Sequence, residues 1–187
     1  MELADFLRWR IKGALTALAG LADSATPDEW TARPYPGANP IGFSMWHPAA
    51  TVDWVVNRLI DGVEELRFGE RWQGTAVGAV VVPFGMPPET AAAIVEGSTG
   101  PEVADYLREV VDTVDRFLSR AGGLDRVPET RRNMVGYPAD RTGEFEEDAE
   151  WMWDAPVWML LGRPAMGHLF MHLGEAEAGL EARRRSN

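Results

Sequence analysis

The sequence predicts an all-α protein, an up-down four-helix bundle with long connections between helices 2 and 3 and between helices 3 and 4. Several segments repeat apolar residues at alternating spacings of four and three, which is typical of bundle helices. Stretches rich in Pro and Gly separate these segments. With 187 residues, of which 45% are hydrophobic, the chain can form one sizeable core, so we expect residues 1–187 to be a single domain.

The first predicted helix runs to about Asp23. Its apolar seam consists of Leu3, Leu7, Ile11, Ala14, Leu18 and Leu21. Thr26-Pro27-Asp28-Glu29 then forms a capping box with proline at the first helical position, which predicts one short extra turn.

The second predicted helix opens at Asn39-Pro40 and continues to about Ile60. Pro48 has two interpretations. If the helix begins at Asn39, this proline lies in the interior and kinks the axis beside His47. If the helix begins at Ser44, Pro48 lies in the first turn and costs little.

Residues 68–100 are rich in Gly and Pro and form the first long connection, with one short helix predicted over residues 87–96. Residues 79–82 have the composition of a strand but no obvious partner. The third long helix begins at Pro101 and ends at Gly122-Gly123. Its seam consists of Val103, Leu107, Val110, Val114, Phe117 and Ala121.

Residues 124–162 form the second long connection, and the fourth helix is predicted to open at Arg163-Pro164. The end of this connection is rich in tryptophan. These rings either plug the open end of the bundle as ordinary core or wall a small-molecule pocket. Taken with two tryptophans of the second helix, the candidates for a cofactor-binding wall are Trp46, Trp54, Trp153 and Trp158.

Composition narrows the classes of function. A formal net charge of −11 argues against nucleic acid and anionic membrane surfaces as partners, because both require clustered Lys and Arg. The absence of cysteine excludes disulfides and a protein-borne thiol nucleophile. We see no signal peptide and no apolar run near the ~18 residues of a membrane span, so we expect a soluble, cytoplasmic protein.

The histidines suggest the chemistry. His168 and His172 are four residues apart on the fourth helix, so their rings share one face and could both coordinate the same divalent metal ion. His47 is the third histidine and the candidate to complete a triad; the alternative is that all three are structural and hydrogen-bond to backbone carbonyls. Glu175 lies on the same stripe and could orient His172, act as a catalytic base, or be an exposed helix carboxylate.

Three neutral imidazoles would leave a coordination position open for water or substrate. Zn²⁺, Ni²⁺ and Fe²⁺ all suit imidazole ligands, and the sequence does not select among them.

Asn39-Pro-Ile-Gly-Phe-Ser-Met-Trp46-His47, followed by Ala50-Thr51-Val-Asp53-Trp54, is similar to the second-helix signature of the DinB-like superfamily. Arg163-Pro-Ala-Met-Gly-His168-Leu-Phe-Met-His172-Leu-Gly-Glu-Ala-Glu is similar to its fourth-helix signature. The resemblance implies a metal-binding four-helix bundle with His47, His168 and His172 as the ligands.

Relatives in that superfamily include thiol S-transferases and mycothiol-dependent isomerases. The resemblance therefore implies a metal-dependent enzyme that activates a small, mycothiol-like thiol for transfer to a small electrophile. Two alternatives stay open: a metal-dependent hydrolase of a small substrate, and a metal-binding stress-response module without turnover. Family resemblance alone suggests a homodimer.

Overall fold

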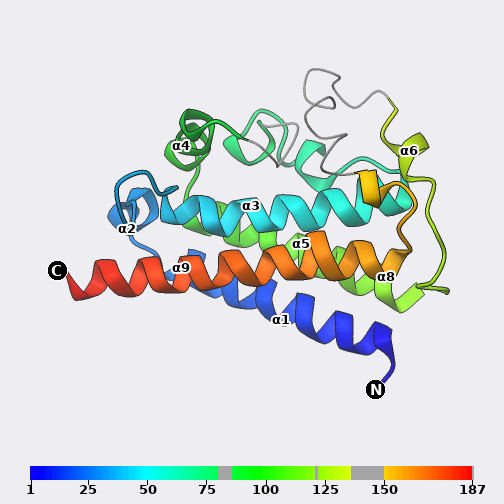
Figure 1. Ribbon diagram of the computed structural model, residues 1–187. Coiled ribbons are helices and arrows are strands. Elements are labelled where there is room, and N and C mark those ends of the chain that lie inside the picture. The colour runs from blue at the N-terminus through cyan, green and yellow to red at the C-terminus, as the bar shows by residue number, and fades with distance from the viewer. Residues whose placement is uncertain (80–85, 121, 136–149, 187) are drawn as a thin grey trace.

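The computed structural model describes residues 1–79, 86–120, 122–135 and 150–186, and every regular element in that part of the chain is helical (Figure 1). Its long helical segments are α1 (Leu3–Ser24), α3 (Ile41–Asp53) continued by the π-helical η1 (Trp54–Asp61), α5 (Gly100–Arg120), and the unbroken run of α8 (Val157–Leu160), η5 (Leu161–Gly167) and α9 (His168–Arg185). The all-α prediction is confirmed for these residues.

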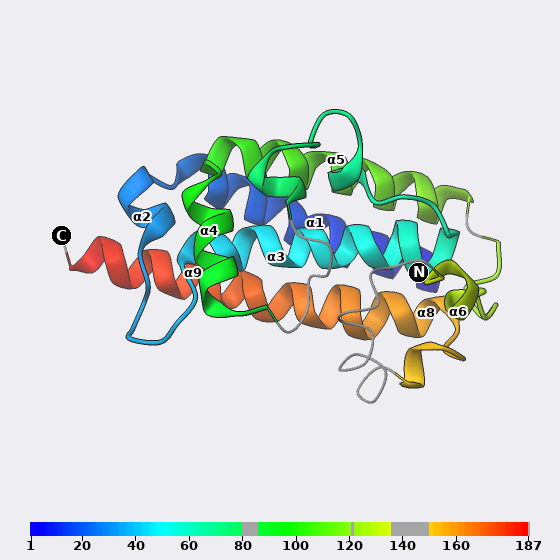
Figure 2. The ribbon, with the colours of Figure 1, turned by 90° about the horizontal axis from the view of Figure 1, so that it is seen from above.

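The long helices do not alternate strictly in direction. Figures 1 and 2 show that α3 and α5 run the same way, whereas α1 and α9 run opposite to them. The connection between Asp61 and Gly100 carries the chain back along the bundle before α5 begins. The simple up-down order predicted from the sequence therefore fails at this connection, because a crossover this long permits two successive parallel helices.

The bundle core follows the predicted seams. α1 packs chiefly on α5, and α3 packs chiefly on α9. Two members of the first seam are exceptions: Leu3, the first residue of α1, is 47% exposed, and Leu21 is half-buried. Ala121 of the predicted third seam lies outside the described residues. The seam residues that are buried are Leu7, Ile11, Ala14, Leu18, Val103, Leu107, Val110, Val114 and Phe117.

The shorter elements lie at the ends and along one side of the bundle. The Thr26 capping box is confirmed at the start of α2 (Pro27–Thr31), and the predicted short helix is confirmed as α4 (Pro88–Glu96). Of the strand-like residues 79–82, Ala79 follows a 3₁₀ turn and the other three lie outside the described residues. The remaining short elements are η2 (Leu66–Phe68), η3 (Ala76–Gly78), α6 (Thr130–Asn133) and η4 (Glu150–Met152).

Two prolines lie inside helices and not at their starts. α3 begins at Ile41, so Pro48 is an interior residue, as in the first of the two interpretations above. The fourth helix begins at Val157, so the prediction that Arg163-Pro164 opens it is wrong. Pro164 instead lies within η5. An interior proline removes an i→i−4 hydrogen bond of an α-helix, and in a π-helical segment these bonds are already replaced by bonds between residues five apart.

None of the helices in the described part of the chain has the length and apolarity of a membrane span.

Candidate metal centre

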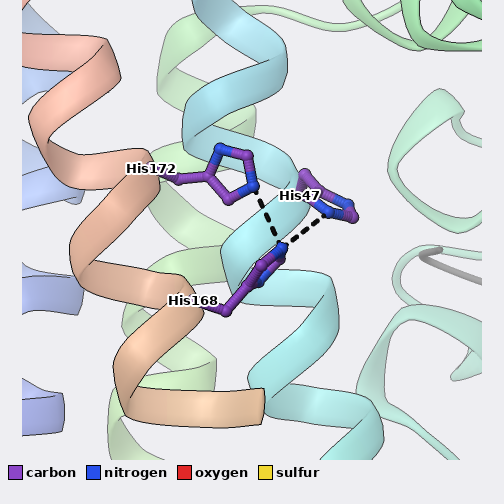
Figure 3. Close-up of side chains that lie close together, drawn as sticks. All are labelled: His47, His168 and His172. Carbon is purple, nitrogen blue, oxygen red and sulfur yellow. Dashed lines mark hydrogen bonds between the residues drawn. The ribbon is translucent and has the colours of Figure 1, made fainter. Parts of the chain in front are cut away.

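Two helices that pack against each other bring the three histidines together. His47 projects from the middle of α3, and His168 and His172 project from the first turns of α9 (Figure 3). The helical spacing of four puts the latter two rings one above the other, facing α3. The packing of α3 on α9 therefore brings His47 to the two histidines of α9.

The geometry of the three rings fits a divalent cation. The Nε2 atom of His168 lies 3.1 Å from Nε2 of His47 and 3.1 Å from Nε2 of His172. Ligand nitrogens at about 2.0–2.1 Å from one ion, in tetrahedral or octahedral geometry, lie about 2.8–3.4 Å apart. The rings stand nearly perpendicular to one another, with interplanar angles of 77–86°. All three can therefore aim a lone pair at one point.

Burial keeps two of the imidazoles, those of His47 and His168, in their neutral, ligating form. His47 and His172 are buried, and His168 is half-buried. Burial, with smaller contributions from His168, His172 and Arg67, lowers the pKa of His47 well below its ordinary 6.5. Burial and the neighbouring His172 lower the pKa of His168 to about 4. At neutral pH these two rings therefore carry no proton that would compete with a metal.

Neighbours on α3 hold the ring and backbone of His47. The ring of Phe43, one turn earlier, stacks on the imidazole with centroids 4.8 Å apart and planes 13° from parallel. One turn later, the Thr51 hydroxyl donates to the His47 carbonyl at 3.0 Å. A ligand with so little rotational freedom is already oriented before a metal binds.

Glu175 supports His172 from the other edge of its ring. Its Oε2 atom lies 2.6 Å from His172 Nδ1, whereas the ring's Nε2 faces the other histidines. The Ser44 hydroxyl of α3 donates to the same carboxylate oxygen at 3.2 Å. Of the three interpretations of Glu175, this contact is the one expected of a residue that orients a ligand.

The tryptophans predicted to bind a cofactor differ in burial and in their contacts. Trp46 is fully buried and donates its indole N–H to the Val77 carbonyl at 3.1 Å, and Trp54 is 1% exposed. Trp153 is 8% exposed, with the Arg131 guanidinium 5.4 Å from its ring centroid. Trp158 is 42% exposed.

The position of Trp158 sets it apart from the histidines. It is the second residue of the helical run that leads to His168, ten residues later. Since an α-helix rises about 1.5 Å per residue and a π-helix less, the two residues lie at most about 15 Å apart along the axis. Trp46, Trp54 and Trp153 all belong to the buried core, and a cofactor-binding role for any of the four stays a prediction.

A buried polar cluster beside this site was missed at the sequence level. Asp53 of α3 is fully buried; its Oδ1 accepts from Asn57 Nδ2 at 2.7 Å and from the Leu66 N–H at 3.0 Å. Its Oδ2 accepts from the Tyr106 hydroxyl at 2.7 Å and from the Arg67 N–H at 3.3 Å. Burial raises the pKa of Asp53 even against these donors. A lone acid within the apolar second helix was the available signal.

The geometry can be compared with known proteins. The family model of the DinB superfamily matches residues 10–152, which include His47 and end before His168. No curated protein and no solved structure matches the chain. The match covers most of the chain, agrees with the all-helical fold, and does not depend on the fourth-helix histidines that complete the triad. The chain therefore belongs to the DinB superfamily.

Proposed function

We propose that this protein is a metal-dependent enzyme that binds one divalent cation and activates a small, mycothiol-like thiol for transfer to a small electrophile. The observation that carries the proposal is the convergence of the Nε2 atoms of His47, His168 and His172. These residues would hold the cation, and Glu175 would keep His172 in the tautomer that presents Nε2.

The charges around the triad favour an anionic co-ligand. The three imidazoles are neutral ligands, so the protein supplies no negative charge in the inner shell. The Arg67 guanidinium is fully buried near His47, but it is paired with the equally buried Glu65 carboxylate at 3.6 Å, so it adds little net positive charge. A cation bound there would supply Lewis acidity that lowers the pKa of a thiol or water in the remaining position. The cation's charge, which the neutral inner shell leaves uncompensated, suits a thiolate better than a neutral or cationic group.

The sulfur has to come from a second molecule, because the chain contains no cysteine. In the proposed transfer, the thiol releases its proton to solvent water, and a lone pair of the thiolate sulfur forms a bond to the electrophilic carbon. The leaving group then departs with the electrons of the bond that breaks. The chain's own contribution is to hold the triad in a mostly buried site, where electrostatic effects are stronger than in water.

The first experiment is elemental analysis of protein purified without added metal. The wild type should carry about one ion per chain, whereas His168→Ala and His172→Ala should carry almost none. Met171→Ala is a matched control, since this residue lies on the same turn, is 53% exposed, and should leave metal content unchanged. Equal metal in all four proteins, or none, would remove the basis of the proposal. The analysis would also distinguish zinc, nickel and iron.

The second experiment separates the thiol-transferase from its alternatives. The metal-loaded protein is screened with small electrophiles, with and without a low-molecular-weight thiol. Thiol-dependent conjugation that is lost in His172→Ala supports the transferase. Turnover that needs only water would instead indicate the hydrolase. A stoichiometric metal site with no turnover in either screen would indicate a metal-binding module.

A further inference from the structure

Ser44 lies at the junction between the two helices that supply the histidines. It is 6% exposed and precedes the ligand His47 by three residues on α3, so both residues point toward α9. Its hydroxyl donates to Glu175 Oε2 at 3.2 Å, and the same oxygen lies 2.6 Å from His172 Nδ1. One serine of α3 is thus linked through one carboxylate to a ligand of α9.

The carboxylate needs such an anchor. The Glu175 side chain is 51% exposed, and a glutamate in that setting has several rotamers open to it in water. The Ser44 hydroxyl approaches from the buried side, where it selects the rotamer that faces His172. A carboxylate held there fixes the orientation of the imidazole and raises its basicity as a ligand.

We propose that Ser44 is a positioning residue that holds Glu175 against His172 and thereby tightens metal binding at the triad. This inference rests on the metal site of the proposed function. It adds that α3 contributes twice: directly through His47, and indirectly through Ser44 and Glu175 to the orientation of His172. Metal affinity then depends on a contact between helices whose residues are 131 positions apart in sequence.

The test is a double-mutant cycle with Co²⁺ as the probe, its dissociation constant measured by competition with a chelator. Glu175→Ala should weaken Co²⁺ binding about 10- to 100-fold. Ser44→Ala should weaken it about 3- to 10-fold, the effect of one hydrogen bond. In the Glu175→Ala background, Ser44→Ala should have no further effect, because Ser44 acts through the carboxylate.

Two controls separate this role from general effects of mutation. Ser98→Ala removes another buried serine hydroxyl, one that donates to the Ile94 carbonyl in α4, and should leave Co²⁺ affinity unchanged. Glu177→Ala removes an exposed carboxylate from the same helix as Glu175 and should also have no effect. Thermal unfolding of the chelated variants checks that each one folds.

A second pair of variants keeps the proposal testable if Ser44→Ala fails to fold. Ser44→Thr retains a hydroxyl. Ser44→Val introduces a side chain of the same shape as threonine but without the hydroxyl. Threonine should bind Co²⁺ more tightly than valine by about 3- to 10-fold. Equal affinity in this pair, or losses that simply multiply in the double-mutant cycle, would overturn the role of Ser44 while leaving the metal site intact. A wild-type protein that binds no Co²⁺ would overturn both proposals.

Discussion

His47 and His168 place their Nε2 atoms 3.1 Å apart although they are separated by 121 positions in the chain. The first belongs to α3 and the second opens α9, so the contact joins the first half of the bundle to its last helix (Figure 3). A cation held between them would act as a cross-link between two core helices. Metal binding and folding stability should therefore be coupled.

Removal of the metal should lower the stability of the wild type. At a free metal concentration of about 100 times Kd, binding to the native state adds about 2.7 kcal/mol to the free energy of unfolding. Addition of excess EDTA should remove that increment and lower Tm, which differential scanning calorimetry can measure. His172→Ala serves as the control, because a protein that has lost its site should show no response to EDTA. A similar EDTA response in both proteins would contradict the coupling.

Gly100 should not tolerate a side chain. It begins α5 where that helix meets the end of α1, and a Cβ atom there would collide with the Ala22 carbonyl oxygen. Because backbone cannot move aside as a flexible side chain does, Gly100→Ala should cost about 1–3 kcal/mol in urea denaturation. Gly13 of α1 is the matched control, since a Cβ there meets no atom within 4 Å. Gly13→Ala should be neutral or stabilise by up to about 1 kcal/mol.

The parts of the fold that could be predicted are those determined by neighbours in sequence. The seams of α1 and α5 follow from apolar spacing along one helix, and most of their members are buried. The capping box at Thr26 is likewise local, as is the shared face of His168 and His172. The prediction of His47 as the third ligand rests on different evidence: it is the remaining histidine, and the resemblance to the family implies it.

What the sequence did not predict depends on how helices pack. The Ser44–Glu175 hydrogen bond requires the register of α3 against α9, and helical periodicity carries no information on that register. The parallel course of α3 and α5 depends on the path of the crossover. Pro164 predicts a helix start because proline is common at the first helical position, and no local feature of the sequence indicates the π-helical segment that contains it.

The hydroxyl of Tyr106 should contribute measurably to stability. It is fully buried and donates to Asp53 Oδ2 at 2.7 Å, across the α3–α5 interface. Tyr106→Phe leaves the buried carboxylate with one donor fewer and should cost about 1.5–3 kcal/mol, the range for hydrogen bonds to charged groups. Tyr35→Phe, at a residue 67% exposed, should change the free energy of unfolding by less than about 0.5 kcal/mol. Equal effects in urea denaturation would show that the Asp53 contact adds nothing.

Glu29 should make the stability of the protein depend on acidic pH. The Arg184 guanidinium, with Nε 2.8 Å from Oε1, and the Thr26 N–H lower the pKa of this carboxyl from 4.5 to about 2. A carboxyl with a lower pKa in the folded state stabilises it above the unfolded value of 4.5, and that contribution is lost as pH falls from 4.5 toward 2.

Glu29→Gln tests this directly, because glutamine can still accept from the Thr26 N–H but has no charge to offer Arg184. The variant should be less stable than wild type by about 1 kcal/mol at neutral pH, as expected for a well-formed ion pair whose Arg184 side chain is exposed to solvent. The difference in Tm should shrink as the pH is lowered from about 6 to about 3, since the wild type alone loses the contribution of a charged carboxyl. Glu181→Gln breaks an exposed ion pair with Arg185 on the same helix and should cost less than about 0.5 kcal/mol. A Tm difference for Glu29→Gln that stays constant across this pH range would mean that the contact between Glu29 and Arg184 stabilises the fold through side-chain packing and not through charge.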